Sequence, residues 1–116
     1  MENKPTTWQG HFELTSCAAA DFEQAIPPEV LGVAVIYSQA PDGEKIFLVI
    51  ESRASSLRAQ CLKRLQTAKL PPLASLMISF KGETLADTSA EAVHAACRRQ
   101  VILAGELRRE LRPAMR

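Results

Sequence analysis

Serine hydroxyls and basic side chains are interspersed over residues 52–64, after an apolar segment of the chain. If a helix begins within this stretch, its first backbone amides point to one place and attract an anion. Serines and arginines beside those amides could hold a phosphate. The alternative is an ordinary helix start, in which serines cap backbone amides and arginines are solvated. The predicted phosphate-binding residues are Ser52, Arg53, Ser56, Arg58, Lys63 and Arg64.

Other arrangements typical of enzyme sites are missing from the sequence. Cys17, Cys61 and Cys97 are far apart and form no C-x-x-C pair, which favours neither a zinc site nor a disulfide framework. The glycines occur singly, so no glycine-rich phosphate loop is present. The acidic residues are dispersed, whereas a metal site needs several converging ligands. We therefore expect no catalytic residue, no metal and no cofactor.

The formal net charge of +1 conceals a split between the two halves of the chain. Residues 1–51 carry eight acidic and two basic side chains, while residues 52–116 carry twelve basic and five acidic ones. This asymmetry is typical of an anion-binding face, but it also arises where the halves neutralise each other or where copies associate. The predicted partner is nucleic acid or another protein, and the oligomeric state stays open.

Two apolar segments define the centre of the predicted fold. Residues 31–38 and 45–50 are rich in β-branched and aromatic side chains, and Asp42-Gly43 between them favours a hairpin. Because nearly every position in both segments is apolar, these strands are of a kind that tends to be covered on both faces, and we expect helices on at least one side of the pair.

Amphipathic patterns and turn residues predict the remaining elements. The chain is expected to be α+β, with a small, mainly antiparallel three-stranded sheet in the order β-β-α-β-α, flanked by helices. We assign residues 1–10 to a flexible N-terminal arm and residues 11–116 to a single domain. The expected elements are a possible edge strand at 11–14, a short helix at 18–25, a helix at 54–68, a strand at 73–80, a turn at 81–83 and a helix at 90–111, capped by Thr88 or Ser89.

No apolar run approaches the roughly 20 residues that span a bilayer, and the N-terminus lacks a secretory pattern. We expect a cytoplasmic protein that has no membrane partner.

The element order and several short motifs resemble those of the GIY-YIG nuclease family. The segment 32–37 resembles the family's Gly-Ile/Val-Tyr motif, and the segment 45–52 resembles its second motif. The segment 56–60 resembles the Asn-Leu-x-x-Arg at the start of the family's helix, and 90–113 resembles the closing helix. The resemblance spans residues 26 to 113, and it implies a nuclease-shaped framework.

The chain departs from the family at the positions where the resemblance implies catalytic groups. The family's tyrosines, glycine, arginine and metal-binding glutamate are replaced, which implies a scaffold that has lost the reaction. We therefore expect a catalytically inactive binding or regulatory module that could take nucleic acid, and we expect the replaced positions to lie near one another. These positions are Ala34, Leu48, Ile50, Gln60 and Cys97, or Ala104 in place of Cys97 if the alignment starts from Pro113.

Two other functions stay open. The acidic first half and basic second half also suit a protein-interaction or self-association module. An active metal-dependent endonuclease would need substitute groups such as Glu51, Glu91 or Tyr37, and it is the least favoured of the three.

Overall fold

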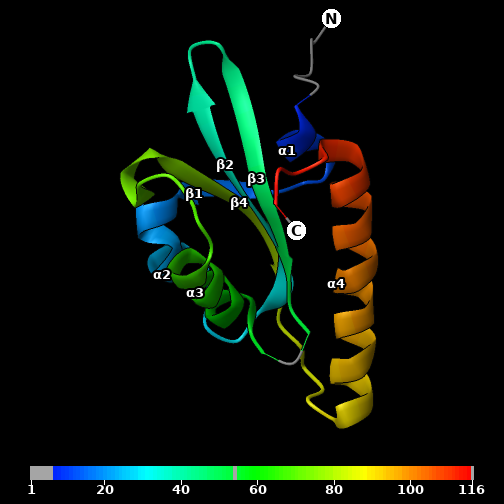
Figure 1. The fold of residues 1–116 in the computed structure, drawn as a ribbon. Helices are drawn as coiled ribbons and strands as arrows, with labels where there is room; N and C mark the ends of the chain where they lie inside the picture. The colour runs from blue at the N-terminus through cyan, green and yellow to red at the C-terminus, as the bar shows by residue number, and fades with distance from the viewer. Residues whose placement is uncertain (1–6, 54, 116) are drawn as a thin grey trace, which may run out of the picture.

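A four-stranded antiparallel sheet lies between helices on its two faces (Figure 1). The computed structural model describes residues 7–53 and 55–115. The strand order is β1-β4-β2-β3, so β2 and β4 are central and β1 and β3 form the edges. The strands are β1 Thr15–Ala18, β2 Leu31–Ala40, β3 Gly43–Glu51 and β4 Leu76–Glu83. The helices are α1 Trp8–His11, α2 Phe22–Ala25, α3 Leu57–Thr67 and α4 Ala90–Leu111, with short 3-10 turns η1 Ala19–Asp21 and η2 Leu73–Ser75.

The predicted hairpin forms the centre of the molecule. Strands β2 and β3 pair from Val33↔Glu51 to Ala40↔Gly43, with a register shift between Ile36 and Tyr37. Gly43 has a φ of 134°, a conformation that favours glycine, at the turn between the strands. Strand β4 then pairs along the other side of β2.

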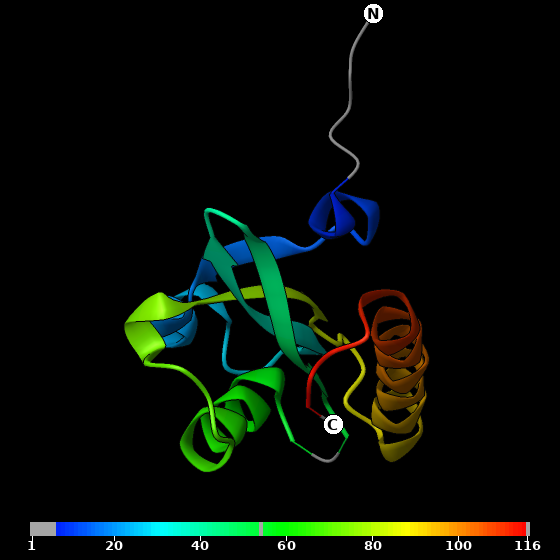
Figure 2. The same cartoon turned by 45° about the horizontal axis from the view of Figure 1, so that its top comes forward.

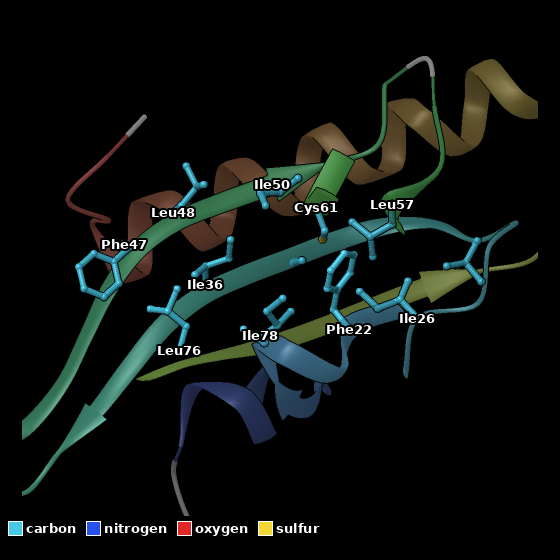
Figure 3. Close-up of a cluster of buried hydrophobic side chains, with 13 residues drawn as sticks. Phe22, Ile26, Ile36, Phe47, Leu48, Ile50, Leu57, Cys61, Leu76 and Ile78 are labelled. Atoms are coloured by element: carbon cyan, nitrogen blue, oxygen red, sulfur yellow. The ribbon is translucent and has the colours of Figure 1, made fainter. Parts of the chain in front are cut away.

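Each face of the hairpin packs into a separate hydrophobic core, as the continuous apolar pattern of its strands predicts. Ala34 and Ile36 of β2 pack with Leu57 and Cys61 of α3 in the core shown in Figure 3. The alternate β2 residues pack with α4 on the opposite face, and they are Val33, Val35 and Tyr37, in contact with Ala104 and Leu107. The second view shows α3 and α4 on opposite sides of the sheet (Figure 2). The hairpin therefore fixes both helices relative to each other.

Gly32 allows β2 and β4 to approach closely near the end of the hairpin. A Cβ atom at this position would lie 2.0 Å from the carbonyl oxygen of Lys81, so no other residue fits without moving backbone. The backbone amide of Gly32 also donates to Ser52 Oγ, and the amide of Ser52 donates to the carbonyl oxygen of Gly32. These contacts hold the end of β3 in place, and Arg53 follows directly.

The structure corrects the predicted three-stranded sheet. The fourth strand is β1, which pairs with Met77–Phe80 of β4. It directly follows the expected edge strand at 11–14, because residues 8–11 form α1 and Glu13 turns the chain with a φ of 58°. The expected turn at 81–83 is also wrong, since these residues continue β4 and pair with Leu31–Val33.

The N-terminal region differs in part from the expected arm. Trp8 lies in α1, and its ring packs edge-on against Tyr37 with 5.1 Å between ring centroids. Residues 1–6 of the expected arm lie outside the described residues.

Within residues 7–53 and 55–115, no helix has the length and apolar character needed to cross a membrane.

Candidate anion-binding groove

The hydroxyls of the predicted phosphate site hold the backbone in the structure. Ser52 has 0% of its surface exposed, and its Oγ accepts a hydrogen bond from the amide of Gly32 at 3.1 Å. Ser56 is the N-cap of α3, and its Oγ accepts from the amide of Ala59 at 3.3 Å. These bonds match the alternative reading of the sequence, an ordinary capped helix start.

The basic residues of the predicted phosphate site differ in their contacts and in their exposure. Arg58 Nε donates to the carbonyl oxygen of Ile26 at 2.9 Å, and Arg58 Nη2 donates to that of Glu23, which ties α3 to α2. Lys63 is exposed and Arg64 is half-buried on α3. Arg53 instead extends from the end of β3 with a side chain that is 67% exposed, and it lies beside α4. Phosphate binding by the α3 residues stays a prediction.

Arg53 lines two hollows that run beside α4. The first has a volume of about 300 Å³, and the second has a volume of about 460 Å³. We call the two together the arginine groove. Its lining residues are Arg53, His94, Cys97, Arg98 and Val101 in the first hollow, and Arg53, Arg108, Arg112, Pro113 and Met115 in the second.

A bidentate ion pair joins β3 to α4 beside the groove. Arg108 Nη1 donates to Glu51 Oε2 at 2.7 Å, and Arg108 Nη2 donates to Glu51 Oε1 at 2.9 Å and to the carbonyl oxygen of Val49 at 2.9 Å. Arg53 Nε lies 3.7 Å from Glu51 Oε1. The carboxylate therefore holds Arg108 in one orientation and lies close to Arg53.

The electrostatic environment keeps Glu51 ionised. Its side chain is 9% exposed, and burial alone would raise its pKa. The hydrogen bonds and charge of Arg108, with a contribution from Arg53, outweigh burial and leave the pKa of Glu51 below its usual range. The same pairing, against an opposing effect of burial, raises the pKa of Arg108.

The remaining arginines of the groove keep their charge available to a ligand. Arg98 Nη2 lies 3.1 Å from His94 Nε2, and because arginine has only donors, the histidine nitrogen accepts. Arg112 ends α4 in the left-handed conformation, with a φ of 51°, which directs the chain back toward β3. Four arginines thus line the groove, and Glu51 is the acidic residue paired with two of them.

The positions singled out by the nuclease resemblance do not form one cleft. Ala34 and Ile50 are paired across β2 and β3, and with Leu48 they lie buried in the core beneath α3. Leu48 and Ile50 are seen among that core's side chains in Figure 3. Gln60 is half-buried on α3, where its amide donates to Ser55 Oγ at 2.8 Å. Cys97 is on α4, against the opposite face of the sheet, as is the alternative position, Ala104.

The residues considered for an active nuclease are also dispersed. Tyr37 is 1% exposed and accepts a hydrogen bond from Ser79 Oγ at 3.2 Å. Glu51 is paired with Arg108, and Glu91 is exposed in the first turn of α4. Across the part of the chain that the structure describes, no group of three or more His, Cys, Asp or Glu side chains is placed to hold a metal ion.

No protein-family model matches the chain, and neither a curated protein nor a solved structure matches it. The nuclease resemblance therefore has no support from these comparisons.

The α4 side of the groove is what sequence reasoning missed. Arg98, Arg108 and Arg112 are separated from Arg53 by at least 45 residues, so no local motif joins them. A signal was nevertheless present, because Arg108 and Arg112 have the four-residue spacing that places side chains on one face of a helix.

Proposed function

We propose that this chain is a binding module for nucleic acid, and that the arginine groove holds the phosphates. The observation that carries the proposal is the convergence of four arginines, from β3 and α4, on two hollows that share Arg53.

Arginine is the side chain best suited to this role. Its planar guanidinium presents five donors in a geometry that matches phosphate oxygens, and it stays charged at any physiological pH. Arg53 is largely exposed and Arg98 and Arg112 are exposed, so a ligand in solution can contact them. Arg108 is held in place by Glu51 and the Val49 carbonyl, and its charge is already paired with that carboxylate.

A polymer of phosphates fits the elongated groove better than one small anion. The two hollows lie along the side of α4, and arginines occur in both of them. Each phosphate contacted releases a counterion from the polymer, so affinity accumulates along the groove.

The alternative of a protein-interaction module stays a prediction. The large apolar side chains that are exposed in the described residues are divided among α3, η2 and α4, and they are Leu62, Leu73, Val101 and Ile102. Singly exposed apolar residues are normal on protein surfaces, so they do not favour this function over binding at the groove.

The test measures fluorescence anisotropy of labelled DNA of about 20 nucleotides, single-stranded and duplex, at low salt. Binding of either form is expected to weaken about tenfold or more in the triple variant Arg53→Gln, Arg98→Gln, Arg112→Gln.

Two control variants make the test specific to the groove. Arg109→Gln removes an exposed arginine of α4 that does not line the groove, and Lys63→Gln removes a charge from the predicted α3 patch. Both should bind nearly as well as the unmodified chain. Absence of binding at low salt, or a loss in Arg109→Gln or Lys63→Gln as large as that in the triple variant, would overturn the proposal.

A further inference from the structure

The two hollows of the arginine groove combine charge with apolar surface. Cys97 and Val101 line the first, and Pro113 and Met115 line the second. Volumes of about 300 and 460 Å³ are far above the roughly 10–15 Å³ that one water needs. A phosphate contacts only the arginines, so the apolar surface and most of the space suit a larger, flat and less polar group.

The surface around the groove does not suit a duplex. A protein reads duplex DNA by inserting a helix or a strand pair into a groove of the nucleic acid. The outer side of α4 is mixed in charge and less suited to insertion, because exposed Ile102, Glu106 and Glu110 follow Arg98 at four-residue spacing. Carboxylates in that row would repel the phosphates on both sides of a DNA groove.

A single strand offers both unstacked bases and phosphates to the lining of the groove. Its bases are not held in a stack, so each can turn toward a protein and stack on arginine planes or on an aromatic ring, such as that of His94 in the first hollow. Arg53 belongs to both hollows, which places it where the phosphate that joins two such bases would lie.

We infer that the arginine groove binds single-stranded nucleic acid, with a base entering each hollow and the phosphate between them on Arg53. This inference rests on the proposed function and narrows it to one class of nucleic acid. The recognition chemistry is common to DNA and RNA, so the experiment compares the two.

The experiment uses four labelled probes of about 10 residues each at one low salt concentration. They are oligo-dT, oligo-rU, a blunt duplex of mixed sequence, and an abasic strand that keeps every sugar and phosphate of oligo-dT without its bases. Either or both of the single strands should bind at least about tenfold more tightly than the duplex and the abasic strand. Arg53→Gln should weaken the single-strand complex several-fold, and Arg109→Gln should not.

The outcomes separate this inference from the proposed function. If the abasic strand or the duplex binds as tightly as oligo-dT and oligo-rU, phosphates alone are recognised, and the inference fails while nucleic-acid binding stands. If none of the four probes binds at low salt, the proposed function fails and the inference fails with it.

Discussion

Glu51 links the stability of the domain to the charge of the groove. Its carboxylate is 9% exposed and is bound by both nitrogens of the Arg108 fork. Breaking a partly buried pair of this kind leaves Arg108 without its counterion and without two charge-assisted hydrogen bonds. The residue therefore stabilises the contact between β3 and α4, and it also cancels part of the positive charge offered to a ligand.

The low pKa of Glu51 predicts how the stability contribution depends on pH. A carboxyl whose folded pKa is depressed stabilises the protein fully above its ordinary, unfolded pKa of about 4.5, and this contribution disappears as the pH falls through the folded pKa. We expect Glu51→Gln to lower the free energy of unfolding by about 1–2 kcal/mol at pH 7, and by much less near pH 3. Urea denaturation of the variant and of the unmodified chain at several pH values measures the loss of unfolding free energy at each pH.

The matched control for this prediction is Glu110→Gln, which changes an exposed carboxyl of the same helix that holds Arg108. It should alter stability by less than about 0.5 kcal/mol at either pH. A loss in Glu51→Gln that is as large at pH 3 as at pH 7 would show that the ion pair is not its cause.

At the scale of elements, the segment after α4 covers the edge of β3. The amide of Ala114 donates to the carbonyl oxygen of Ile46 at 3.1 Å, and the amide of Met115 donates to that of Phe47 at 2.8 Å. Figure 1 shows this segment running back to β3 from the end of α4. Since unpaired strand edges are templates for pairing with another chain, the segment protects this edge from association.

Deleting residues 113–116 should expose the β3 edge. We expect the truncated chain to form larger species as its concentration rises, while the full chain changes less over the same range. Sedimentation velocity at several concentrations measures the difference. Met115→Ala keeps both backbone hydrogen bonds and should sediment like the full chain, although losing a half-buried side chain should lower its stability by about 1 kcal/mol. Unchanged sedimentation of the truncated chain would mean that the segment does not protect the edge.

The elements that the sequence predicts well are those with a strong local pattern. Strands β2 and β3 contain the continuous apolar runs 31–37 and 46–50, and α4 has the predicted bounds, 90–111. Strand β1 was placed wrongly because most of its residues are exposed, so it depends on pairing with β4 rather than on its own pattern. Lys81-Gly82-Glu83 has the composition of a turn, but backbone partners in β2 extend the strand through it.

The candidate site could be predicted only in part for the same physical reason. Arg53 was found because it lies next to a helix start, a feature of local sequence. Its partners on α4 are brought to it by the packing of two helices on opposite faces of the hairpin, which no local pattern encodes. Val101 illustrates the limit: an apolar side chain on an amphipathic helix is usually buried, whereas Val101 is 38% exposed in the groove and Gln100 is buried instead.

At the scale of the whole molecule, folding neutralises only some of the charge of the basic half. Glu51 from the acidic half pairs with Arg108, and Glu13 lies 3.6 Å from Lys81. Arg98 contacts a histidine, and Arg53 is 67% exposed beside the same Glu51 that Arg108 already occupies. The groove therefore keeps more positive charge than the net value of +1 indicates.

This charge distribution predicts the salt dependence of binding. For single strands, the logarithm of the affinity falls with the logarithm of salt concentration with a slope of about −0.7 for each phosphate neutralised. Arg53, Arg98 and Arg112 contribute one phosphate contact each, while Arg108 is already neutralised by Glu51, so we expect a slope of about −2. Titrations with oligo-dT across a range of salt concentrations measure this slope.

Each single change to glutamine at these three positions should make the slope shallower by about 0.7, and Arg109→Gln should leave it unchanged. Glu51→Gln should instead make it steeper, because it returns Arg108 to the ligand. A slope that stays the same in all of these variants would mean that the bound phosphates lie outside the groove.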